Sequence, residues 1–188
     1  PPHFSFRDKV AENVRKGAEG TDRAFAMMYD ISGHNPATLV ADLKADWKHL
    51  VQDLGLTESE AYLHHNGRPV IGLWGLGFLD RPGSASEALE ILDFFQNNSD
   101  TELRASVVGG VPTYWRTLSG DSKTEGAWST YYLRLDVLSP WAVGRYANAA
   151  GADDFRSNHI VPDLLATKQA GVDYMPVVFP GFSWANLK

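Results

Sequence analysis

Residues 69–78 read PVIGLWGLGF, which is a short apolar run followed by a tryptophan and glycines. A short run rich in branched apolar residues is typical of a buried strand in a parallel sheet. Four more apolar runs end in Trp, Gly, Pro, Arg or Asp, and helical stretches connect one run to the next. These runs are 24–29 (AFAMMY), 105–109 (ASVVG), 136–138 (DVL) and 174–179 (YMPVVF). The repeat predicts an α/β protein with its polar strand-end residues gathered at one end of the sheet.

Capping residues and apolar spacing predict the helices between these runs. Asn35 and Pro36 are suited to start the clearest helix, whose apolar residues follow helical spacing: Leu39, Leu43, Trp47, Leu50 and Leu54. Ser84 and Glu87 have the spacing of a capping box for another helix. A further helix is expected from about residue 5 to residue 18. Asn66-Gly67 predicts a small hairpin before the second core strand.

The spacing of the strands favours two architectures. Successive runs lie about 30 to 45 residues apart, which suits a (β/α)8 barrel, a fold of about 250 residues. Five strands cannot close such a barrel. We therefore expect about five consecutive βα units that form either part of a (β/α)8 barrel or an open parallel sheet of the doubly wound kind.

Domain organisation follows from the same pattern. No linker or low-complexity stretch divides the chain, so residues 1–188 are expected to form a single α/β domain that is part of a larger barrel. The chain begins at Pro1 and ends at Lys188 soon after the last run, with no helix to cover that strand. We therefore expect a processed product or an excised piece.

Composition narrows the possible partners. Hydrophobic residues make up 44% of the chain, enough for one core, and no apolar stretch is long enough to cross a membrane. There is no cysteine, which excludes disulfides and thiolate metal sites. The net charge of −6, with scattered Lys and Arg, argues against a nucleic-acid surface. We expect neither nucleic acid nor a membrane as partner, and a neutral substrate is favoured.

In both architectures a ligand binds at the carboxyl ends of the strands, so the residues that follow each run are the candidates. Asp30 is the candidate catalytic acid. The candidate substrate-binding residues are His34, Trp74, Trp115, Arg116, Trp141, Arg145, Tyr146 and Trp184. Indole rings can stack on the C–H face of a sugar while charged groups bind its hydroxyls. The remaining tryptophans, Trp47 and Trp128, are assigned to the core.

Structural roles remain open as alternatives for the same residues. Each strand-end tryptophan could instead pack in the core, and Arg116 and Arg145 could form surface ion pairs. Asp30 could form an Asx turn with Ser32 and Gly33. Glycosidases usually need two carboxylates, and no second one follows another strand.

Metal and cofactor sites are not predicted. Asp30 and the histidines His34, His64, His65 and His159 are ligand types for zinc, but none of them has a recognised spacing. Adjacent His64 and His65 would point to opposite faces of the hairpin. Nucleotide-binding motifs are also absent from the sequence.

The segments around the five runs read AFAMMYDISG, HNGRPVIGLWGLGF, VVGGVPTYWR, DVLSPWAVGRY and DYMPVVFPGFSW. In this order they resemble barrel glycoside hydrolases related to families 71 and 99, in particular the branch labelled xylosidase/arabinosidase. The resemblance implies a (β/α)8 barrel that acts on glycans, works without a bound metal and is often secreted. It also implies a catalytic Glu-x-x-Glu segment after PGFSW, which this chain, ending at Lys188, does not contain. Asp30 loosely matches an acidic residue of the family at the same strand end.

The leading hypothesis is a glycoside hydrolase, or a fragment of one, that binds a neutral oligo- or polysaccharide at the carboxyl ends of its strands. Because the expected acid/base pair is missing, catalysis is left open. The alternatives are a non-catalytic, lectin-like carbohydrate-binding protein and a metal-dependent polysaccharide hydrolase or deacetylase. A second chain or a C-terminal fragment is expected to complete the barrel. The glycosylation triplet Asn97-Asn98-Ser99 fits an extracellular location.

Overall fold

The structure is a computed structural model, and it describes residues 4–179. Its strands are β1 (Met27–Asp30), β2 (His64–His65), β3 (Arg68–Trp74), β4 (Ser106–Val111), β5 (Val137–Pro140) and β6 (Asp173–Tyr174). The α-helices are α1 (Phe4–Ala18), α2 (Leu39–Lys48), α3 (Ala85–Asn97), α4 (Ala127–Tyr132), α5 (Ala149–Phe155) and α6 (Val161–Ala170). Short π-helical turns extend α2 at its end and join α5 to α6. None of the helices between residues 4 and 179 is long and apolar enough to cross a membrane.

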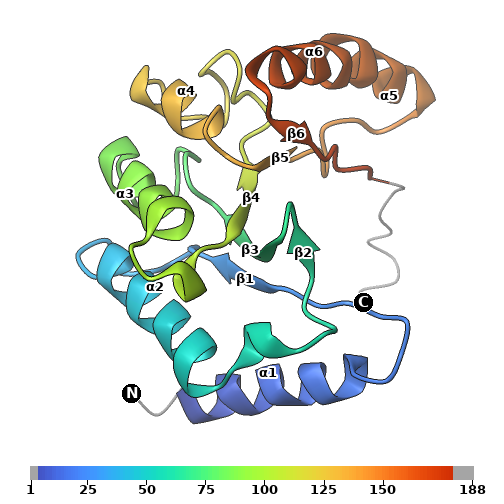
Figure 1. The fold of residues 1–188 in the computed structure, drawn as a ribbon. Helices are drawn as coiled ribbons and strands as arrows, with labels where there is room; N and C mark the ends of the chain where they lie inside the picture. Colours follow the sequence, from blue (N-terminus) through green and yellow to red (C-terminus); the bar gives the residue numbers. More distant parts are fainter. Residues whose placement is uncertain (1–3, 180–188) are drawn as a thin grey trace, which may run out of the picture.

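The parallel part of the sheet has the order β1-β3-β4-β5-β6, so each strand lies beside the next one in the chain. This confirms the predicted α/β class with a parallel sheet. The order does not reverse, as it does in a doubly wound sheet, so the doubly wound form is not observed. In Figure 1 the helices α1, α2, α3, α4 and α6 form an arc around one side of the sheet. Among residues 4–179 no helix covers the other face of the sheet, which we call the uncovered face (Figure 1).

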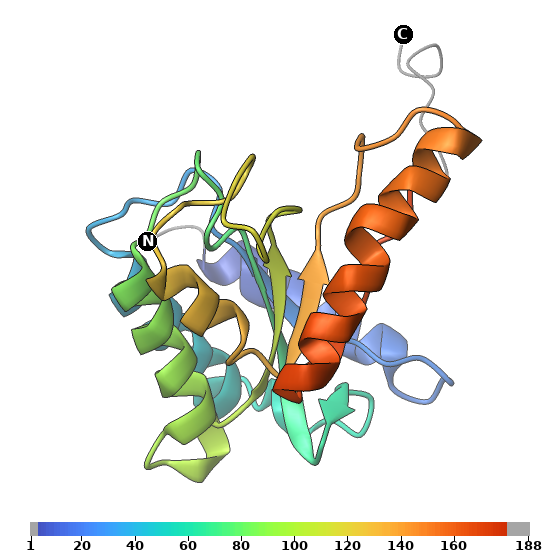
Figure 2. The same ribbon diagram turned by 90° about the horizontal axis from the view of Figure 1, so that it is seen from above.

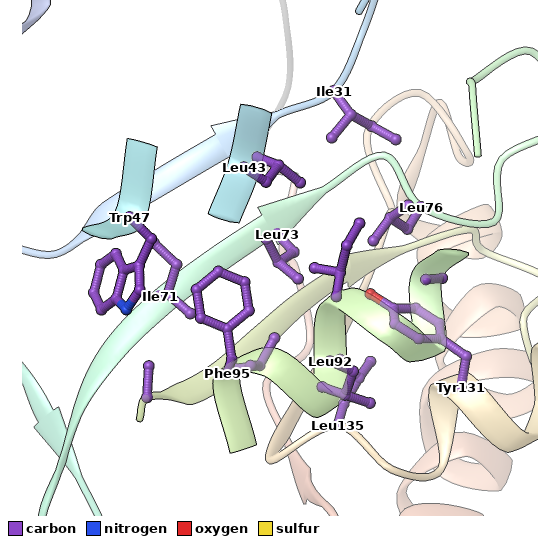
Figure 3. Close-up of a cluster of buried hydrophobic side chains, with 14 of the residues drawn as sticks. Ile31, Leu43, Trp47, Ile71, Leu73, Leu76, Leu92, Phe95, Tyr131 and Leu135 are labelled. Carbon is purple, nitrogen blue, oxygen red and sulfur yellow. The ribbon is translucent and has the colours of Figure 1, made fainter. Parts of the chain in front are cut away.

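The core lies between the sheet and this arc of helices, and Figure 3 shows part of it. Ile71 and Leu73 of β3 project toward α2 and α3, where Trp47 packs edge-to-face against Phe95 with 5.6 Å between ring centroids. The indole Nε1 of Trp47 donates to the Leu103 carbonyl at 2.9 Å. Trp47 and Trp128 are fully buried, so their assignment to the core is confirmed.

The predicted hairpin joins β2 to β3, and its turn places Asn66 and Gly67 at φ 51° and 76°. Both angles are positive, which is the geometry that favours Asn-Gly in a two-residue turn. The hairpin contacts two other strands, because Ser106 donates to the His65 carbonyl at 2.9 Å and His65 Nε2 lies 2.8 Å from Asp173. Figure 2 shows β2 near the starts of the parallel strands. The hairpin therefore lies across the amino end of the uncovered face.

Other local predictions are confirmed or corrected. Ser84 and Glu87 form the expected capping box at the start of α3. The Asn35 side chain instead accepts from Ala37 in a turn, and α2 begins only at Leu39. The last run was expected to be a strand over 174–179, but β6 ends at Tyr174. Met175 still donates to Leu138 of β5, and the ladder between the two strands ends there among the described residues.

Candidate functional site

Alternation along the strands decides which residues face the uncovered side of the sheet. Asp30 pairs with Trp74, Trp74 with Gly110, and Gly110 with Ser139, so these four residues form one row across the sheet. Such rows share a face because side chains of paired residues point the same way. With Met28, Gly72, Trp141 and Met175, this row lines a hollow of about 360 Å³ on the uncovered face.

Two glycines make the floor of this hollow possible. A Cβ added at Gly72 would lie 2.9 Å from Met28 Cγ, and one added at Gly110 would lie 2.9 Å from Trp74 Cζ3. Met28 and Trp74 therefore lie flat over the glycine of the neighbouring strand. A larger residue at either position would push the covering side chain away.

Two indole rings form the carboxyl end of the hollow. Trp74 and Trp141 have ring centroids 4.8 Å apart and are tilted by 53°, and Phe78 packs behind Trp74 at 5.1 Å. The backbone of Trp141 is fixed because its N–H donates to Val111 and its carbonyl accepts from Thr113 Oγ1 at 2.7 Å. We call Trp74 and Trp141 the aromatic corner.

Asp30 stands beside the aromatic corner at the end of β1. Its Oδ1 accepts from the Ser32 N–H at 2.8 Å, so the Asx turn considered from the sequence is present. Its side chain is exposed, and within residues 4–179 the carboxylate forms no ion pair and its other oxygen accepts no hydrogen bond. One carboxylate oxygen is thus available to a ligand.

Trp115 and Arg116 follow β4, but they turn toward the helices and away from the hollow. Trp115 is only 2% exposed and packs against Tyr132, so its core alternative is observed. Arg116 Nε donates to the buried carboxylate of Asp163 on α6 at 2.9 Å. Burial raises the pKa of Asp163, whereas Arg116 and then Trp115 favour its charged form. The structure therefore places Trp115 and Arg116 on the side of the sheet that the helices cover, which we call the helical layer.

The other predicted binding residues lie near the carboxyl end, outside the hollow. Arg145 donates to Thr113 and forms an ion pair with Asp121. The hydroxyl of Tyr146 accepts from the Phe179 N–H at 3.0 Å.

The loop after β1 holds the last of these residues, His34. Its Nε2 lies 3.5 Å from Asp42. Trp184 lies outside the described residues. Of the candidates that the structure describes, the site therefore combines Asp30, Trp74 and Trp141 and leaves the others apart.

Sequence reasoning missed the floor of the hollow, namely Met28, Gly72, Gly110, Ser139 and Met175. A usable signal was present. Met28 and Gly72 stand two residues before Asp30 and Trp74, and residues two apart on a strand share a face.

Histidine and carboxylate side chains are not grouped for metal binding in the part of the chain that the structure describes, where no three of them come together. His65 instead pairs with Asp173, and His159 stacks on Phe155. Comparisons of the chain with protein-family models, curated proteins and solved structures found no match.

Proposed function

We propose that this protein binds a neutral oligo- or polysaccharide in the hollow on the uncovered face, as part of a glycoside hydrolase. One observation carries the proposal: Asp30, Trp74 and Trp141 come from separate parts of the chain and line the same hollow. Indole faces suit the C–H face of a sugar ring, and a carboxylate accepts from its hydroxyls. The family resemblance supports the same substrate class and an extracellular location.

We further propose that the sheet is a sector of a (β/α)8 barrel. The sequential strand order and the helices on one side support this, because each added βα unit of a barrel continues in the same direction. The uncovered face would then be the inner wall of the barrel. The hollow would lie at the carboxyl end, where barrel enzymes bind their substrates.

The partner that completes this barrel is a further βα segment, from a second chain or a C-terminal fragment. Both ends of the sector expose apolar residues that such a segment would cover. Phe6 on α1 is 72% exposed and Leu165 on α6 57%. Strands β1 and β6 each have one unpaired edge among the described strands, to which parallel strands can add.

A lectin-like, non-catalytic protein is the second candidate function. It is favoured because, within residues 4–179, Asp30 is the one carboxylate that lines the hollow. Hydrolysis needs a second carboxylate, which the completing segment would have to supply. The hollow is lined by no histidine in this part of the chain, so nothing favours the metal-dependent alternative.

Sugar binding tests the proposal. Cello-, xylo- and manno-oligosaccharides are titrated against the protein, with tryptophan fluorescence and calorimetry as readouts. The variant Trp141→Ala removes half of the aromatic corner and should weaken binding about thirtyfold, as expected for a central aromatic contact worth about 2 kcal/mol. Tyr146→Phe, which keeps its ring outside the hollow, should bind as the wild type does. Equal affinities for all three proteins would refute the proposed site, and reducing-sugar release would separate hydrolase from lectin.

A further inference from the structure

The charge of the hollow is unbalanced. Asp30 is the one ionisable side chain that lines it among residues 4–179, where no Lys, Arg or His contributes to the lining. Other carboxylates near the carboxyl end have cationic partners, such as Asp121 with Arg145 and Asp163 with Arg116. Asp30 therefore presents a negative charge that the described protein does not neutralise.

The aromatic corner, like Asp30, attracts a positively charged ligand. The faces of indole rings carry negative potential, and a cation within about 6 Å of the ring centroid is attracted to them. Trp74 is the direct strand neighbour of Asp30, and Trp141 lies 4.8 Å from Trp74 between centroids. Met28 and Met175 also line the hollow, and their side chains add no charge to it.

We propose that the sugar unit bound beside Asp30 carries a protonated amine, as in a glucosamine-type amino sugar. This inference rests on the proposed glycan binding and changes its substrate class at one position, because the sugar unit beside Asp30 is then cationic and the glycan as a whole is not neutral. The ammonium group contacts the available oxygen of Asp30 and the face of Trp74. The apolar face of the same sugar ring stacks on the aromatic corner. A free hydroxyl or an acetylated amine at that carbon carries no charge and loses the ionic part of this contact.

Three trisaccharides with the same β-1,4 backbone test the inference, because they differ only at carbon 2. These are the glucosamine trimer, its fully N-acetylated form and cellotriose. Binding is measured by calorimetry at about pH 5.5, below the pKa of about 8 that is usual for an α-amino group, so that the amines are protonated. The glucosamine trimer should bind about tenfold more tightly than cellotriose, as expected for one cation–π contact with a neighbouring carboxylate.

Two variants with the same change in formal charge identify the responsible group. Asp30→Asn should abolish the tenfold preference. Asp22→Asn, in the exposed turn after α1, should keep it, which controls for the general attraction of a cation to a protein of net charge −6. Thermal melts confirm that both variants fold.

The outcomes separate the two proposals. If cellotriose binds as tightly as the glucosamine trimer, or more tightly, the inference is overturned and sugar binding stands. If the preference persists in Asp30→Asn, or disappears in Asp22→Asn, the assignment to Asp30 is overturned. If xylo- or manno-oligosaccharides bind and none of the three trisaccharides does, the amino-sugar inference fails and the proposed sugar binding stands. If no oligosaccharide binds, the proposed function fails with it.

Discussion

Replacing Gly110 by alanine tests how the aromatic corner is held in place. The added Cβ would approach the Trp74 ring well inside 3.0 Å, with Cζ3 at 2.9 Å, and real Cβ atoms essentially never come that close. Trp74 must therefore move, and it packs against both Trp141 and Phe78. Overpacking of this kind costs about 1–3 kcal/mol. For a chain of this length, about 2–4 °C of melting temperature corresponds to each kcal/mol.

We therefore expect Gly110→Ala to melt about 2–12 °C below the wild type and to change the near-ultraviolet circular dichroism of its tryptophans. Gly126→Ala is the matched control, because a Cβ there meets no atom within 4 Å and the backbone is helical at φ −56°. This control should melt at or slightly above the wild-type temperature. A Gly110→Ala protein with wild-type melting and an unchanged tryptophan signal would refute the packing argument.

Three further predictions concern the helical layer. Trp47→Ala should cost about 3–5 kcal/mol in guanidinium denaturation, because it leaves a large cavity and an unpaired Leu103 carbonyl; a loss below about 1 kcal/mol would contradict this. Arg116→Met should destabilise more than Asp163→Asn, because Asp163 is buried whereas Arg116 is one-third exposed and can hydrate. Since burial raises the pKa of Asp163, the loss of unfolding free energy in Arg116→Met should shrink as pH falls. A loss that does not change with pH would count against this role of Asp163. Hydrogen bonds to Asp53 and Asp8 raise the pKa of His49. The contribution of His49 to folding stability should therefore be complete below about pH 6.5 and be lost as pH rises through the raised pKa. Urea titrations of wild type and His49→Gln across this range should converge at high pH, and parallel curves would refute the linkage.

Much of the sheet could be predicted because its signals are local. The apolar runs mark buried strands, Asn66-Gly67 specifies its turn, and Ser84 with Glu87 specifies a helix start. The length of β6 could not be predicted in the same way. It depends on where β5 ends beside it, and β5 belongs to a distant part of the sequence.

Only some residues of the candidate site could be predicted, for a similar reason. Asp30 and Trp74 are the last residues of their strands, so alternation fixes the face to which they point. Trp115 lies beyond the end of β4 in a turn, where this period no longer applies, and its ring enters the core. Arg116 is directed by the buried Asp163, which is distant in the sequence. That a residue follows a strand therefore predicts at which end of the sheet it lies, but not the direction in which its side chain points.

We propose that a glycan binds over Gly72 and Gly110, beside the aromatic corner. Nuclear magnetic resonance of the labelled protein, titrated with cello-, xylo- and manno-oligosaccharides, can locate the bound sugar. We expect shifts in the amide signals of Gly72 and Gly110 and in the indole N–H signals of Trp74 and Trp141, while the indole signals of buried Trp47 and Trp128 stay in place. Shifts confined to the helical side of the sheet, or no shifts with any of these sugars, would contradict it.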